Sequence, residues 1–270
     1  MLIAGESPKA LAYCISLERR PDRWNAFLAQ KGVLEFPVVL RVPAVDGGTV
    51  DIWSDDRVSL LARRNIATGE RRDHSELNTR GAIGCYLSHL EIWKRVLGEG
   101  RSYAIVFEDD AQVPIGTFAA IQRLLDEEHD GAPWDVRLLG ALSLTLASER
   151  GRASRDGWRR CVGFMGTHAY AITPAGAAKL LRRSLPIMLH VDGYMSICAR
   201  FGDLRVECHE RLKLLQRPSS SDIQELPCPI CHIPSNRSLT RALRSVVVLL
   251  AALAALAGLA ALAVVWRLRR

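Results

Sequence analysis

The chain has 270 residues, enough for one large domain or two small ones with a substantial core. Hydrophobic residues make up 49% and charged residues 24%, which excludes wholesale disorder and collagen-like repeats. The formal net charge is +7, but only five of the 36 basic residues are lysine. Arginine suits phosphate binding because its guanidinium binds two oxygens at once, although a general bias towards Arg and Ala explains the count equally well. We therefore expect no nucleic-acid partner.

Alternating strands and helices are predicted through most of the chain. The expected strands are 11–17, 36–42, 103–107, 136–139 and 168–173. One expected helix begins at Pro21, and three others cover 82–97, 118–125 and 174–183. Residues 46–80 are polar and predict loops around a short helix. Residues 147–160 contain five arginines and predict either a solvated loop or a lid over an anionic ligand. The alternation indicates an α/β fold with a largely parallel sheet.

The C-terminal region has a different composition. Residues 217–245 are rich in proline, serine and arginine and predict a linker, whereas 246–266 are 21 residues without a charge. As a helix this run is about 32 Å long, close to the ~30 Å hydrocarbon core of a bilayer. A buried core helix is the alternative, but the run has no polar face. We predict a membrane span at 246–266 and a basic tail at 267–270.

The cysteines and the N-terminal residues indicate the cellular compartment of the main domain. Seven cysteines, an odd number in mostly apolar surroundings, indicate reduced thiols rather than a disulfide framework. Glu6, Pro8 and Lys9 interrupt any apolar run of the kind a signal peptide needs. We expect a membrane protein with a single C-terminal anchor and a cytosolic main domain at 1–216.

A run of acidic residues follows the predicted strand at 103–107. Glu108, Asp109 and Asp110 would lie at the carboxyl edge of the sheet, where α/β proteins bind ligands. A divalent cation relieves the repulsion between such carboxylates and bridges to diphosphate oxygens. Strand alternation places Glu108 and Asp110 on one side, where they could share the metal. The alternative is that the triplet begins a loop and caps the next helix.

A group of arginines follows the first predicted strand. Arg19, Arg20 and Arg23 lie where the strand turns into a helix, a position suited to diphosphate recognition. Exposed arginines paired with Glu18 and Asp22 are the alternative reading.

Six segments in this order resemble glycosyltransferase family 25, the group that contains lipopolysaccharide and collagen sugar transferases. They are YCISLERRPDRW (13–24), RGAIGCYLSHLEIWKRVL (80–97), YAIVFEDDA (103–111), GTHAYAITPAGAAKLL (166–181), VDGY (191–194) and QRPSSSDI (216–223). The resemblance implies a GT-A fold, a Rossmann-like sheet that binds a nucleotide sugar, with UDP-galactose as the usual donor and transfer with inversion.

The resemblance also implies roles for individual residues. The residues expected near the nucleotide are Ser16, Leu17, Arg19 and Arg23. Glu108 and Asp110 would bind Mn²⁺ or Mg²⁺, with Asp110 the more direct ligand, and Glu108 or Asp109 would lie near the ribose. The first acidic position is Glu, not the Asp of a strict Asp-x-Asp motif, so the exact ligand set stays open.

Two further residues belong to the resembling segments. An inverting transfer needs a base for the acceptor hydroxyl, and we predict Asp192 for this role, with a helix N-cap as the alternative. His89 either reaches the substrate or holds its helix through a buried hydrogen bond.

Together these features predict a membrane-tethered, metal-dependent glycosyltransferase. Its acceptor would be a glycan, a glycolipid or a hydroxylated peptide, and the hexose would be galactose by preference. The rival hypothesis is a membrane-anchored, catalytically inactive module that binds a nucleotide sugar. A metal-dependent nucleotidyltransferase accounts for the acidic triplet but leaves the SH, GTHAY and VDGY segments unexplained.

Overall fold

The computed structural model describes residues 10–126, 133–147, 157–218 and 223. The chain divides into two compact units, Met1–Glu225 and Leu226–Arg270, and every described residue lies in the first. The predicted span at 246–266, the tail at 267–270 and most of the predicted linker at 217–245 therefore lie outside the described residues.

The expected membrane location is corrected here. In the part of the chain that the structure describes, no helix has both the length and the apolar character needed to cross a bilayer. The expectation depended on 246–266 alone, a run that lies outside this part.

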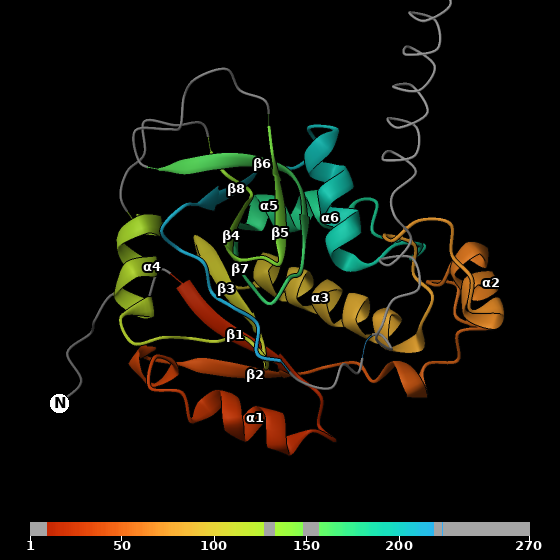
Figure 1. Ribbon diagram of the computed structural model, residues 1–270, viewed down its shortest axis with the longest axis horizontal. Coiled ribbons are helices and arrows are strands. Elements are labelled where there is room, and N and C mark those ends of the chain that lie inside the picture. Colours follow the sequence, from red (N-terminus) through yellow and green to blue (C-terminus); the bar gives the residue numbers. More distant parts are fainter. Residues whose placement is uncertain (1–9, 127–132, 148–156, 219–222, 224–270) are drawn as a thin grey trace, which may run out of the picture. The chain divides into compact units, whose positions relative to one another are not determined.

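The described residues form a mixed sheet with strand order β2-β1-β3-β7-β4-β8-β6-β5 (Figure 1). The strands are β1 (Ala10–Ser16), β2 (Val39–Pro43), β3 (Tyr103–Glu108), β4 (Val136–Gly140), β5 (Ser143–Leu146), β6 (Trp158–Met165), β7 (Ala169–Ile172) and β8 (Val206–His209). The helices are α1 (Pro21–Leu28), α2 (Leu60–Thr68), α3 (Arg80–Gly98), α4 (Thr117–Asp126), α5 (Pro174–Leu181) and α6 (Val191–Arg200), with short 3₁₀ turns at Val33–Glu35 and Gly47–Thr49. The predicted α/β class is confirmed.

The sheet is parallel in one half and mostly antiparallel in the other. Strand β1 pairs in parallel with β2 and β3, as the strand–helix alternation predicts. Strand β7 is antiparallel to both β3 and β4, and β6 is antiparallel to β5 and β8. The predicted loop at 147–160 overlaps β6, which begins at Trp158, while 148–156 lie outside the described residues. A strand with exposed arginines at 159 and 160 lacks the apolar run used to predict strands.

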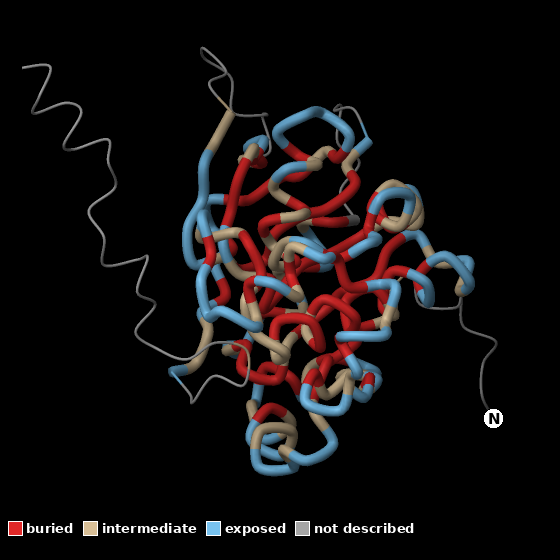
Figure 2. Tube along the Cα trace, turned by 90° about the vertical axis from the view of Figure 1, so that its right-hand side faces the viewer, coloured by how far each residue is buried: buried red, intermediate tan, exposed pale blue. Residues whose placement is uncertain are grey.

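Two hydrophobic clusters cover the two faces of the sheet. Along β3, Ala104 and Val106 pack into the cluster that contains α3, α5 and α6. The alternate residues Tyr103, Ile105 and Phe107 pack into the cluster that contains α1 and α4. Figure 2 shows the buried segments inside and exposed segments around them. The two faces of β3 are thus fixed by this alternation.

Helix α3 is the main support of the site. Thr79 caps its N-terminus, with the hydroxyl oxygen accepting a hydrogen bond from the Ala82 amide at 3.2 Å. Near its start the helix passes so close to the 45–47 backbone that a Cβ at Gly84 would lie 2.3 Å from the Val45 carbonyl oxygen. Gly84 therefore fixes the distance between α3 and the loop after β2.

Replacing Gly84 by Ala is expected to lower the free energy of unfolding by about 2–3 kcal/mol, because backbone atoms must move to admit the methyl group. Gly98→Ala at the other end of α3 is the matched control. A Cβ there meets nothing within 4 Å, and we expect a gain of about 0.5–1 kcal/mol. Urea denaturation of both variants checks the pair, and equal effects of the two substitutions would contradict the close approach.

Candidate active site

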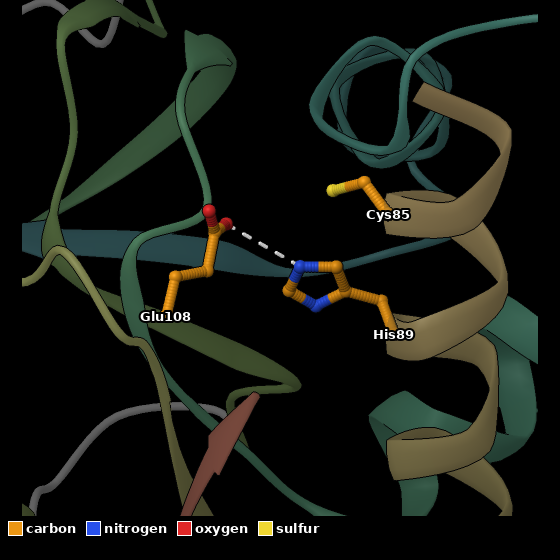
Figure 3. A group of neighbouring side chains, drawn as sticks. All are labelled: Cys85, His89 and Glu108. Carbon is orange, nitrogen blue, oxygen red and sulfur yellow. Dashed lines mark ion pairs between the residues drawn. The ribbon is translucent and has the colours of Figure 1, made fainter. Parts of the chain in front are cut away.

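Glu108 ends β3 on the side that faces α3. Its Oε1 accepts a hydrogen bond from the Thr167 hydroxyl at 2.7 Å and lies 3.4 Å from His89 Nε2. Figure 3 shows His89 extending from α3 towards this carboxylate. Burial alone raises the pKa of Glu108, but the interactions with His89 and Thr167 outweigh it and bring the pKa below its ordinary value.

Asp109 and Asp110 are held by one arginine from α1. Arg23 Nη2 lies 2.6 Å from Asp109 Oδ1 and 2.7 Å from Asp110 Oδ2. The Ala111 amide donates to the Glu108 carbonyl, so the strand ends in a turn and alternation stops at Glu108. Glu108 contacts α3, whereas Asp110 contacts Arg23 from α1. The structure thus gives Glu108 and Asp110 different partners, in contrast to the shared side predicted from alternation.

Residues 215–217 pass alongside the acidic turn. The Gln112 amide donates to the Leu215 carbonyl at 2.7 Å, and Gln216 Nε2 donates to Asp110 Oδ2 at 3.1 Å. Arg217 donates twice, from its amide to the Asp110 carbonyl and from Nη2 to the Asp109 carbonyl. The last predicted segment, QRPSSSDI, therefore begins at the acidic turn.

The carboxylates of the turn are shifted by burial and by each other. Burial and the negative charge of Glu108 raise the pKa of Asp110 from 3.8 to about 6, against the opposing effect of Arg23. Burial likewise raises the pKa of Asp109. Among the described residues, Asp110 Oδ1 is buried without a hydrogen-bond partner. A hard divalent cation fits this turn, because it would give that oxygen a partner and offset the surplus negative charge.

A pocket joins the loop after β1 to the acidic end of β3. It is lined by seven of the predicted site residues: Ser16, Leu17, Arg19, Arg23, His89, Glu108 and Asp109. Asp110 and Asp192 do not line it. Three side chains that the sequence analysis does not identify also shape this region: Asp46 lies 2.6 Å from Arg19, Arg41 donates to the Leu17 carbonyl, and Cys85 lines the pocket one turn before His89. The Cys-x₃-His spacing on α3 was the available signal for Cys85.

His89 is completely buried, and its other ring nitrogen, Nδ1, has a hydrogen-bond partner. Nδ1 lies 2.9 Å from the Tyr170 hydroxyl, which accepts a further hydrogen bond from Trp93 Nε1. The buried hydrogen bond of one reading is therefore present, and His89 also lines the pocket. Its contact with a substrate stays a prediction.

Asp192 lies in the first turn of α6, and its carboxylate accepts from the Gly166 and Gly193 amides, each at 2.8 Å. The N-cap of α6 is His190, so the capping alternative for Asp192 is wrong. Asp192 lines a second pocket with His74, Ser75, Phe164, Met165 and His190. Cys85 and Ile223 line both pockets, so the two adjoin.

Comparisons with known proteins agree with the resemblance seen in the sequence. Residues 10–195 match the family described as glycosyltransferase family 25 (LPS biosynthesis protein). Three similar curated proteins each match over 68% of this chain. "Inactive glycosyltransferase 25 family member 3" of Homo sapiens is 31% identical over 31% of its own length, and "Glycosyltransferase 25 family member" of Anopheles gambiae is 33% identical over 31% of its own length. "Procollagen galactosyltransferase 1" of Danio rerio is 28% identical over 30% of its own length. The match thus spans about a third of each curated relative.

Among solved structures, mannose-1-phosphate geranyltransferase from Thermus thermophilus aligns with 77% of this chain and 76% of its own, at a TM-score of 0.39 and 18% identity. The family match covers more than half of the chain. The chain belongs to glycosyltransferase family 25.

Proposed function

We propose that the chain is a metal-dependent transferase that moves a hexose, galactose by preference, from a UDP-sugar to a hydroxyl group of a glycan, glycolipid or hydroxylated peptide, with inversion. One observation carries this proposal. A single pocket combines the arginine-bearing loop after β1 with the acidic end of β3. Cationic side chains beside carboxylates are what a nucleotide diphosphate with its metal needs.

The donor would lie in this pocket. Ser16 and Leu17 would contact the nucleotide, and Arg19 and Arg23 would bind the diphosphate oxygens. Asp109 and Asp110 would hold Mn²⁺ or Mg²⁺, which supplies positive charge for the departing diphosphate. Arg23 already lies against both carboxylates, so it is placed to share that role.

The acceptor would lie in the adjoining pocket beside Asp192. The acceptor oxygen forms a bond to the anomeric carbon as the bond from that carbon to the diphosphate oxygen breaks. The hydroxyl proton passes to the Asp192 carboxylate, and UDP leaves with the electron pair. Both carboxylate oxygens of Asp192 already accept backbone hydrogen bonds, which would hold it in a fixed orientation.

The test is sugar-nucleotide hydrolysis by the full chain against a panel of UDP- and GDP-sugars, with and without Mn²⁺. We expect metal-dependent UDP release, fastest from UDP-galactose. Folded protein that neither releases nor binds UDP would contradict the proposal.

Replacing Asp192 by Asn tests the base. The Asn carbonyl oxygen can still accept one of the two amide hydrogen bonds, but it cannot take a proton. We expect transfer to fall about 100-fold or more while the Kd for UDP stays unchanged. Asp203→Asn, at a half-exposed side chain, is the control. A transfer rate within about tenfold of that of the unmodified chain would show that Asp192 is not the base.

The second candidate function is an inactive module that binds a nucleotide sugar. It is favoured by the Arg23 salt bridges, which occupy one oxygen of each aspartate. Two of its mammalian relatives, in human and in cattle, are also named inactive or probably inactive. UDP binding without turnover in the hydrolysis test would favour this candidate.

A further inference from the structure

Helix α3 and the end of β3 bring a thiol, an imidazole and a carboxylate together. Cys85 and His89 are four residues apart and therefore lie on one face of α3, opposite Glu108 (Figure 3). One ligand atom from each residue lies within 4.8 Å of the other two. All three residues line the same pocket.

We propose that Cys85 Sγ, His89 Nε2 and a Glu108 carboxylate oxygen form a binding site for Zn²⁺ or a similar ion that accepts sulfur and nitrogen ligands. This ligand set differs in chemistry from Asp109 and Asp110, whose oxygens alone suit Mn²⁺ or Mg²⁺. Three protein ligands with a fourth position towards the pocket is the arrangement of an open zinc site. The site does not depend on the proposed transferase activity.

His89 gives the independent sign that a ligand belongs here. The side chain is fully buried, and its Nε2 has no hydrogen-bond partner among the described residues. That atom lies 3.4 Å from Glu108 Oε1, longer than a good hydrogen bond. Two ligands at about 2.0–2.1 Å from a tetrahedral ion are about 3.4 Å apart. The separation therefore suits two ligands of one ion better than a direct hydrogen bond.

Neighbouring side chains hold these ligands in place. The Tyr170 hydroxyl at His89 Nδ1 fixes the imidazole ring with Nε2 towards the pocket. Thr167 donates to Glu108 and limits the rotation of its carboxylate. Such outer hydrogen bonds are what orient the ligands of protein metal sites. Binding would release the Cys85 thiol proton to solvent, so that one thiolate and one carboxylate balance the two charges of the ion.

The chain offers a competing ligand set that the experiment must separate. Cys228, Cys231 and His232 are close in sequence and lie outside the described residues. The titration therefore uses the metal-free full chain in two forms, unmodified and with Cys228→Ser and Cys231→Ser together. Co²⁺ is the probe, since a bound thiolate gives it a charge-transfer absorption, and Zn²⁺ is then added to displace it.

We expect the double variant to bind one Co²⁺ with thiolate-to-cobalt absorption, and Zn²⁺ to abolish it. Adding Cys85→Ser should remove the absorption and weaken binding at least about tenfold, whereas adding Cys198→Ser, at another partly buried cysteine, should change neither. Near-UV circular dichroism confirms that each variant is folded, and Cys85→Ala replaces Cys85→Ser if it is not. No thiolate absorption in the double variant, or absorption that survives loss of Cys85, would overturn the proposal. Because the readout is optical, loss of transferase activity cannot be mistaken for failure of this site.

Discussion

Replacing Asp110 by Asn should reduce metal-dependent sugar transfer about 100-fold or more without lowering the melting temperature at about pH 8. The substitution removes the negative charge that would bind the cation and keeps the size of the side chain. It also relieves a cost in the folded protein, because burial and Glu108 raise the pKa of Asp110 to about 6, above its ordinary 3.8. At about pH 8 the ionised carboxylate is thus less favourable in the folded chain than in the unfolded chain.

Initial rates with and without Mn²⁺, together with melting curves, measure both parts of this prediction. Asp22→Asn is the matched control, since Asp22 lies beside the same loop but is exposed and pairs with Arg20. It should change neither quantity. A variant at Asp110 that retains transfer within about fivefold would show that this carboxylate is not part of the catalytic site.

The sequence predicts the fold best where the chain is apolar and periodic. β1, α1, α3 and β3 all occur within a few residues of their predicted positions, because each has an uninterrupted apolar run or a helical spacing of large side chains. β5 and β8 are four residues long, and β6 carries exposed arginines. β8 lies between β4 and β6, and β6 pairs in antiparallel with β5 and β8, a pairing that local patterns do not contain. The sheet is therefore more antiparallel than the alternation predicts.

The sequence predicts which residues form the candidate site, but not which of them contact one another. Seven of the eight predicted pocket and metal residues line one pocket, yet local alternation wrongly assigned Glu108 and Asp110 to a common side. The turn at 108–111 ends the strand. Tertiary packing then places Glu108 against α3 and Asp110 against α1. Arg23 meets Asp110 across 87 positions of sequence, a contact that no motif spacing reveals.

Replacing Arg23 by Gln should have the largest effect on stability, a loss of about 3 kcal/mol in the free energy of unfolding at about pH 8. Arg23 and the two aspartates are largely buried, with 14%, 7% and 10% of their side chains exposed. Without the guanidinium, two neighbouring carboxylates remain with less compensation. Their pKa values, already raised with Arg23 present, would rise further.

The sign of the pH dependence follows from those raised pKa values. A carboxyl group with a raised pKa in the folded chain contributes fully to stability below its unfolded value and loses that contribution as the pH rises through the folded value. The difference between Arg23→Gln and the unmodified chain should thus be smaller at about pH 5 than at about pH 8. Urea denaturation at both pH values measures it, with Arg20→Gln, at an arginine paired with exposed Asp22, as a control expected to change little.

The same urea denaturation, repeated with a divalent cation, tests the metal site. If Asp109 and Asp110 hold a cation, Mn²⁺ should compensate for the missing guanidinium and restore about 2.7 kcal/mol at about 100 times its Kd. The unmodified chain should gain less, because Arg23 competes with the ion for the same oxygens. Equal stabilisation of both forms, or none in the variant, would show that the acidic turn is a salt bridge to Arg23 and not a metal site. The stability of one variant therefore tests the metal site of the proposed transferase before any acceptor is known.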